Sequence, residues 1–166
     1  MSQENQNLSS KPIQCVVLTI HDGTSSNHDS SGKLIESLLH EGGHEVVYRR
    51  VVKQSEAAVR EAFAEALADD ECEVILTTGG IGVSHKDEVW DILHSLYQKR
   101  IDSFGNLLNT LIFAESGPAC LYSRPSAGII EKHPVFSLPL NSTSIRVALE
   151  KLILPELNTL VLEARK

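Results

Sequence analysis

The sequence predicts a three-layer α/β/α domain with a mainly parallel sheet. Short apolar runs rich in β-branched residues, typical of strands buried on both faces of a parallel sheet, alternate with amphipathic helical patterns. No linker, internal repeat or low-complexity block separates these units. At 166 residues, the chain is long enough for one core without disulfides or a metal. We therefore expect a polar tail at residues 1–11 and a single domain at 12–166.

The first half of the chain predicts three strands, each followed by a helix. In chain order, these are a strand at 13–20, a helix from Ser30 or Ser31 to Gly42-Gly43, a strand at 44–52, a helix capped by Ser55, a strand at 74–78 and a helix at 87–98. Apolar residues recur at helical spacing, as Ile35, Leu38 and Leu39 do in the first helix. Strands joined in this way are expected to run parallel, with right-handed crossovers.

The second half predicts a helix at 104–113, a short strand at 135–138, a turn at 139–142 and a helix that Pro155 interrupts. A further helical segment follows the proline. The loops after the first and third strands and the turn at 139–142 should lie along one edge of the sheet. Ligands usually bind at this edge in open α/β sheets.

Composition excludes several classes of protein. The net charge of −7 and the aromatic content of 5% argue against nucleic-acid binding. No apolar run is long enough to span a membrane, and the polar start has no signal peptide, so we expect a cytoplasmic protein. Cys15, Cys72 and Cys120 form no C-x-x-C pair, and we expect reduced, structural thiols and no zinc site.

The turn Gly79-Gly80-Ile81-Gly82, called the glycine turn below, is the most informative local signal. Glycines let backbone N–H groups approach a ligand, and residues 83–87 are expected to open a helix whose amino end attracts anions. A turn that merely requires glycine conformations is the alternative. Ser84 and Asp87 form an S-x-x-D capping pattern, so the Asp87 carboxylate either only closes the helix or also contacts a ligand.

Other familiar enzyme signatures are absent from the sequence. There is no nucleophile elbow, no Walker sequence ending in Gly-Lys-Ser/Thr and no G-x-G-x-x-G. Common hydrolase, P-loop and dinucleotide-binding interpretations are therefore excluded.

An ordered set of motifs runs through most of residues 13–160. They are Thr19 to Asp22, Asp29-Ser30-Ser31-Gly32, Gly42-Gly43-His44, Ile75 to Gly82 with Asp87 five residues on, Ser123-Arg124 before Ala127-Gly128, Leu138-Pro139 with Asn141-Ser142, and Ile153 to Leu157. With these motifs, the chain resembles the MoaB/Mog family of molybdenum-cofactor biosynthesis proteins. The resemblance implies a MoaB/Mog-like fold, molybdopterin as ligand, a homotrimer, and other proteins of the cofactor pathway as partners.

The resemblance also implies a site. Family enzymes of the Mog type adenylylate molybdopterin with ATP and Mg²⁺, which implies that Asp87 is catalytic and holds the metal. The Asp29 cluster also fits simple helix capping. The residues expected to contact the pterin ligand are Asp29, Ser31, Gly32, Thr78, Gly79, Gly80, Gly82, Ser84, Ser123, Arg124, Pro139, Asn141 and Ser142.

Several positions depart from the family pattern. Gln54 stands where the family has an aspartate of the catalytic pair, and Ile81 stands where it has a threonine. Asn106 and Asn109 replace an acid and a base, and Leu140 replaces the middle glycine of a turn. We therefore keep an adenylyltransferase beside a catalytically silent module for pterin binding or assembly. A different activity on a nucleotide-like or pterin-like anion is a third hypothesis.

Overall fold

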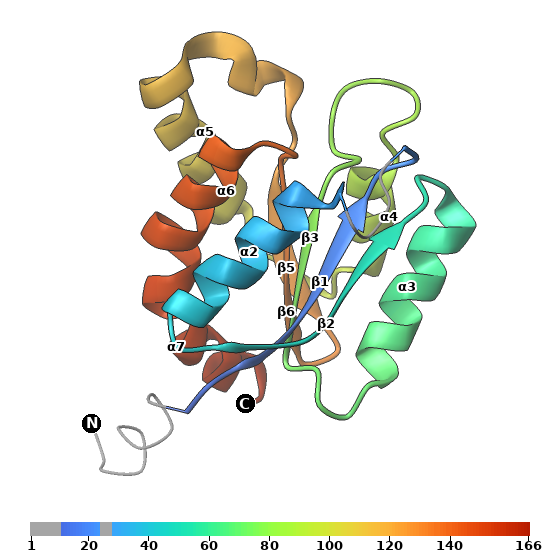
Figure 1. Cartoon of the computed structure of the whole chain (residues 1–166), viewed down its shortest axis with the longest axis vertical. Coiled ribbons are helices and arrows are strands. Elements are labelled where there is room, and N and C mark those ends of the chain that lie inside the picture. The colour runs from blue at the N-terminus through green and yellow to red at the C-terminus, as the bar shows by residue number, and fades with distance from the viewer. Residues whose placement is uncertain (1–10, 24–27) are drawn as a thin grey trace.

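The structure is a computed structural model that describes residues 11–23 and 28–166 (Figure 1). Apart from Lys11, the expected polar tail lies outside the described residues. In the described part, six strands form one sheet in the order β2-β1-β3-β6-β5-β4. The strands are β1 (Gln14–Ile20), β2 (Glu45–Val52), β3 (Val74–Thr78), β4 (Lys99–Arg100), β5 (Ser126–Ile130) and β6 (His133–Leu138).

Helices cover both faces of the sheet, which confirms the predicted three layers (Figure 1). One face carries α2 (Ser30–Glu41), α5 (Asp102–Ser116), α6 (Ser142–Val147), the π-helix η3 (Ala148–Ile153) and α7 (Leu154–Ala164). The other face carries α3 (Glu56–Ala68) and α4 (Val89–Leu96), and the 3₁₀ helix η2 (Gly117–Tyr122) follows α5. Alternate strand residues enter the two cores, as Leu76 and Ile75 do from β3.

The central strands run parallel, so they all end at the same edge of the sheet. β1 pairs with β2 and β3, and β3 pairs with β6, in parallel registers. We call this the carboxyl edge and the opposite one the amino edge. Residues 21–23 after β1, the segments after β2 and β3 and the turn at 139–142 therefore lie at the carboxyl edge. This convergence was predicted for the loops after the first and third strands and for the turn.

The strand β5 was not predicted, and it forms an antiparallel hairpin with β6. Its sequence Ser126-Ala-Gly-Ile-Ile contains small residues that are poor strand formers. A side chain at Gly128 would have its Cβ 2.4 Å from the Tyr97 ring. The glycine is therefore explained by a tertiary contact with α4's end, which a local pattern cannot show.

The predicted opening of a helix at residues 83–87 is wrong, because α4 begins only at Val89. Ser84 accepts a hydrogen bond from the Lys86 N–H (3.3 Å), and the Asp87 N–H binds the Ser84 carbonyl (2.9 Å). The N-cap residue Glu88 makes no side-chain capping bond. Residues 84–87 thus form a turn rather than a capping box, and the Asp87 carboxylate binds elsewhere.

Pro155 does not break the helical run as sharply as predicted. The π-helix η3 lies between α6 and α7, and the Leu154 N–H donates to the Leu149 carbonyl five residues earlier. In a regular α-helix, a proline clashes with the carbonyl four residues before it. The wider π turn accommodates the proline at the start of α7.

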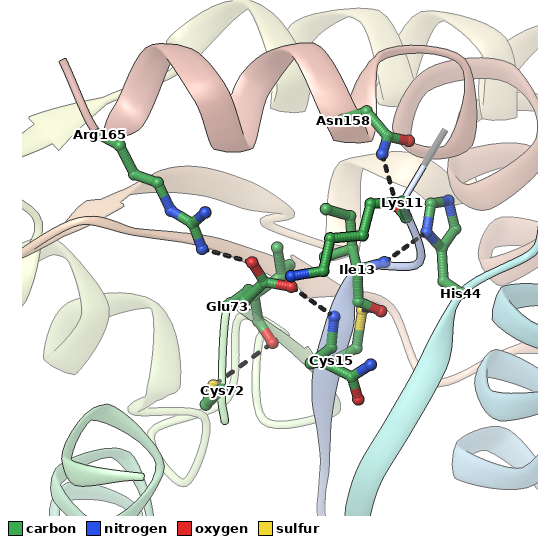
Figure 2. A network of polar contacts seen from close by, with 10 residues as sticks. Lys11, Ile13, Cys15, His44, Cys72, Glu73, Asn158 and Arg165 are labelled. Atoms are coloured by element: carbon green, nitrogen blue, oxygen red, sulfur yellow. Dashed lines mark hydrogen bonds and ion pairs between the residues drawn. The ribbon is translucent and has the colours of Figure 1, made fainter. Parts of the chain in front are cut away.

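A polar network at the amino edge holds the ends of the described chain together (Figure 2). The Glu73 carboxylate accepts hydrogen bonds from the Gln14 N–H (2.9 Å) and from the Arg165 guanidinium (2.5 Å). Asn158 of α7 donates to the Lys11 carbonyl at 3.0 Å. The network fixes α7 against the beginning of β1 and β3.

The cysteines are free, as predicted. Cys15 and Cys72 are buried, and burial raises the pKa of Cys72 to about 12. Both thiols are therefore protonated at neutral pH. Among the described helices, none is long and apolar enough to cross a membrane.

Candidate functional site

The glycine turn is packed between the end of β1 and the start of α4. Gly79 has φ +95°, and a Cβ there would lie 2.3 Å from the Ile20 carbonyl oxygen. Gly80 has φ +70°, and its Cβ would lie 2.3 Å from a Val89 methyl group. The Gly79 N–H donates to the Leu138 carbonyl at 3.1 Å. Close packing within the protein therefore explains both glycines, which supports the structural interpretation of these two.

The turn at 139–142 is attached to the glycine turn. The buried Thr78 hydroxyl donates to the Pro139 carbonyl at 3.0 Å. Asn141 caps α6 by accepting a hydrogen bond from the Ser144 N–H at 2.9 Å. Ser142, the first residue of α6, is exposed to solvent. Thr78 and Pro139 thus hold this corner, while Asn141 and Ser142 line its surface.

Asp29 serves the start of α2. Its Oδ1 accepts hydrogen bonds from the Thr19 hydroxyl (2.8 Å) and the Gly32 N–H (2.9 Å), and its Oδ2 pairs with Arg49 at 2.9 Å. The residue is 1% exposed, and a Cβ on Gly32 would lie 2.1 Å from Oδ2. The capping interpretation is confirmed, and both carboxylate oxygens bind protein groups. Ser31 is half-buried beside them.

Gln54, which follows β2, connects the surrounding loops. Its backbone N–H donates to Asp22 Oδ1 at 2.8 Å. Its side-chain Nε2 donates to the Lys86 carbonyl at 2.7 Å and to Asp87 Oδ1 at 2.9 Å. The other Asp87 oxygen lies against Gly82, where a Cβ would be only 2.6 Å away. This contact accounts for the third glycine of the turn.

Arg124 binds both ends of the segment from Gly82 to Asp87. Its Nε and Nη2 donate to the carbonyls of Gly82 (2.9 Å) and Asp87 (2.8 Å), and its guanidinium lies 5.1 Å from the centre of the Trp90 ring. Much of its donor capacity is used within the protein. Ser123 differs, since its buried hydroxyl has no hydrogen-bond partner within residues 11–23 and 28–166.

A pocket of about 570 Å³ lies between α3, the segment at 83–88 and α4, and we call it the loop pocket. Its lining residues are Glu56, Arg60, Val83, Ser84, His85, Asp87, Glu88, Asp91, Ile92 and Arg124. Of the predicted ligand-contacting residues, Ser84, Asp87 and Arg124 line it. Glu56 and Arg60 were missed, although the start of a helix after a parallel strand belongs at this edge by topology.

The residues present do not fit Mg²⁺. This ion requires nearly octahedral oxygen ligands at about 2.0–2.1 Å, usually including one or two carboxylates. Asp87 Oδ1 instead accepts a hydrogen bond from the Gln54 amide, whose N–H groups would repel a cation at that position. In the described part of the chain, no group of three or more His, Cys, Asp or Glu side chains is placed to hold a metal.

Comparison with protein families gives a match over most of the chain. The family model described as "Probable molybdopterin binding domain" matches residues 16–159. "Molybdenum cofactor biosynthesis protein B" of Bacillus subtilis is 33% identical over 165 residues, covering 99% of this chain and 97% of that protein. The protein of the same name from Escherichia coli K12 is 31% identical over 147 residues, covering 89% of this chain and 86% of that protein.

Solved structures give the same result. A crystal structure of molybdenum cofactor biosynthesis protein B has a TM-score of 0.91 and 33% identity, covering 94% of this chain and 98% of that chain. The crystal structure of a tungsten cofactor synthesizing protein MoaB from Pyrococcus furiosus has a TM-score of 0.84 and 30% identity, covering 94% of this chain and 99% of that chain.

Proposed function

The chain belongs to the molybdopterin-binding family of molybdenum-cofactor biosynthesis proteins, and from this premise we propose that it binds molybdopterin at the carboxyl edge of its sheet. The observation that carries the proposal is the attachment of the glycine turn to two neighbouring segments. Gly79 contacts the end of β1 and donates to the end of β6, while Thr78 binds Pro139. The glycine turn, the end of β1 and the turn at 139–142 are therefore joined at this edge.

Electrostatics favour one part of this surface for the phosphate of molybdopterin. The loop pocket carries the four carboxylates of Glu56, Asp87, Glu88 and Asp91 against the two guanidiniums of Arg60 and Arg124, and this excess of negative charge disfavours a phosphate. The turn at 139–142 instead exposes the polar side chains of Asn141 and Ser142. We place the phosphate at this turn, where hydroxyl and amide groups can donate hydrogen bonds.

Catalysis is a separate question from binding. Adenylyl transfer would use Asp87 together with ATP and Mg²⁺, but Asp87 is bound by the Gln54 amide. We therefore propose that the chain binds molybdopterin without adenylylating it. This is the catalytically silent alternative that the departures at Gln54, Asn106 and Asn109 raised.

Incubation of the full chain with molybdopterin, ATP and Mg²⁺ tests this proposal. We expect the pterin to bind and no AMP to be incorporated, in both the wild type and Asp87→Ala. AMP incorporation that Asp87→Ala abolishes would establish the enzyme instead. Absence of pterin binding would reject the ligand assignment itself.

We also propose that the protein acts in the cytoplasm as a homotrimer, together with other proteins of cofactor biosynthesis. The large exposed apolar side chains Leu107, Phe113, Leu121 and Tyr122 on α5 and η2 support self-association. An apolar hollow of about 360 Å³ between α5, η3 and α7 adds to the surface that a second copy would cover.

A further inference from the structure

Gln54 performs a role that a metal ion performs in many phosphate-binding sites, because it joins loops that carry acidic groups. Its three hydrogen bonds connect the loop after β1, the loop after β2 and the segment after the glycine turn. We infer that Gln54 replaces a divalent cation in positioning Asp87, so that ligand binding by this chain is independent of divalent cations. The inference rests on the proposed function only where it concerns the pterin.

The orientation of the Gln54 amide is determined by its partners. The Nε2 group carries two hydrogens, and each has an oxygen acceptor, the Lys86 carbonyl at 2.7 Å and Asp87 Oδ1 at 2.9 Å. If the amide were flipped, Oε1 would face both of these oxygens, which is unfavourable. The N–H₂ end therefore occupies the Oδ1 side of Asp87, and a cation cannot bind there at the same time.

Asp87 is also restrained by contacts with Gly82 and Arg124. Its Oδ2 lies against Gly82, and its backbone carbonyl accepts a hydrogen bond from Arg124 at 2.8 Å. The carboxylate is therefore held in one orientation without a metal. Gln54 is a positioning residue here, because it acts on the proposed site through Asp87.

A carboxylate at position 54 would reverse this arrangement. Gln54→Asp would keep the backbone N–H that binds Asp22, but it would lose the side-chain N–H that binds Asp87 and add a negative charge beside Asp87. Like charges at this separation repel, and a divalent cation relieves that repulsion by binding the oxygens together. The substitution is expected to create a cation site that the wild type does not have.

Binding of Mn²⁺ alone, measured by the electron paramagnetic resonance signal of the free ion, tests the inference without any pterin. We expect Gln54→Asp to bind Mn²⁺ at least about tenfold more tightly than the wild type. Gln54→Asn, which loses the bridge but adds no charge, serves as the matched control and should bind no better than the wild type. Adding Asp87→Asn to Gln54→Asp should remove the gain. Equal Mn²⁺ affinity in the wild type and Gln54→Asp would overturn the inference.

Molybdopterin binding by the wild type provides a second arm that requires no variant. The single tryptophan, Trp90, contacts Arg124, so its fluorescence reports on the glycine turn. We expect the same affinity in EDTA and in Mg²⁺. Loss of affinity in EDTA would contradict cation independence. If no pterin binds in either buffer, the proposed function fails, while the Mn²⁺ comparison still decides the role of Gln54.

Discussion

Gly79 and Gly43 are two glycines of similar backbone conformation that lie in different surroundings. Both have positive φ, at +95° and +84°, but only Gly79 lies against another strand, whereas nothing lies within 4 Å of a Cβ at Gly43. Alanine at Gly43 should lower the free energy of unfolding by about 1 kcal/mol through backbone strain alone. Alanine at Gly79 should cost about 1–3 kcal/mol more, because its Cβ meets the Ile20 carbonyl. Urea unfolding of the two variants checks this, and equal losses would contradict the packing argument.

His44 makes stability depend on pH. It is 5% exposed, and its Nδ1 accepts a hydrogen bond from the Ile13 N–H at 3.1 Å (Figure 2). Burial lowers the pKa of His44 below its ordinary value of 6.5. The unfolded chain therefore binds the proton more readily, so the stabilisation is complete above pH 6.5 and is lost as the pH falls through the lowered pKa.

Unfolding free energies between about pH 7.5 and pH 5 test this dependence. His44→Asn, which cannot titrate, should show a smaller decrease than the wild type. His40→Gln is the matched control, since His40 is 48% exposed, and it should retain the wild-type decrease. An unchanged decrease in His44→Asn would show that another group is responsible.

Residue roles were predictable where they depend on neighbours in the chain. The cap formed by Asp29 binds Gly32, three residues later, and the Asp-Ser-Ser-Gly sequence indicated it. The bond between Gln54 and Asp87 joins residues 33 positions apart. The resemblance to the family implied that an amide stands at position 54 where relatives have an acid. Only the fold could show that this amide binds the other acid.

At the scale of elements, Glu73 should contribute more to the free energy of unfolding than Arg165, its partner in the network that holds α7. The Glu73 side chain is 14% exposed and also accepts the Gln14 N–H, whereas the Arg165 side chain is 47% exposed. Glu73→Ala leaves a partly buried N–H unpaired and should cost about 1–3 kcal/mol of unfolding free energy. Arg165→Ala removes a solvent-exposed ion pair and should cost less than about 1 kcal/mol. Chemical denaturation measures both, and the reverse order would contradict the assignment.

Elements whose apolar residues recur at regular spacing were predicted well, and elements that depend on tertiary contacts were not. The strands and helices of the first half of the chain were placed within a few residues. The strand β5 was missed because its Gly128 is required by the Tyr97 ring rather than by the strand itself. The start of α4 was placed too early because Asp87 binds Gln54 instead of capping the helix.

At the scale of the whole molecule, the exposed apolar side chains of α5 and η2 predict self-association. Phe113 is 57% exposed and Leu121 is 74% exposed. Burying such side chains against a second copy favours assembly, and a charge there opposes it. Leu121→Asp should convert the proposed trimer to smaller species in light scattering coupled to size-exclusion chromatography. Ala64→Asp, an exposed position of α3 on the other face, should leave the mass unchanged. A monomeric wild type would contradict the prediction.

The placement of molybdopterin at the carboxyl edge rests on the whole arrangement of parallel strands and loops. A negative charge at the exposed Ser142 should repel the phosphate, whereas the same charge at Ala68, where α3 ends at the amino edge, should not.

Equilibrium dialysis of molybdopterin against the wild type, Ser142→Asp and Ala68→Asp is the most direct measurement. We predict binding by the wild type and Ala68→Asp with equal affinity, and binding about tenfold weaker by Ser142→Asp, a difference of about 1.4 kcal/mol. Equal affinity of all three proteins, or no binding by the wild type, would contradict a molybdopterin site at this edge.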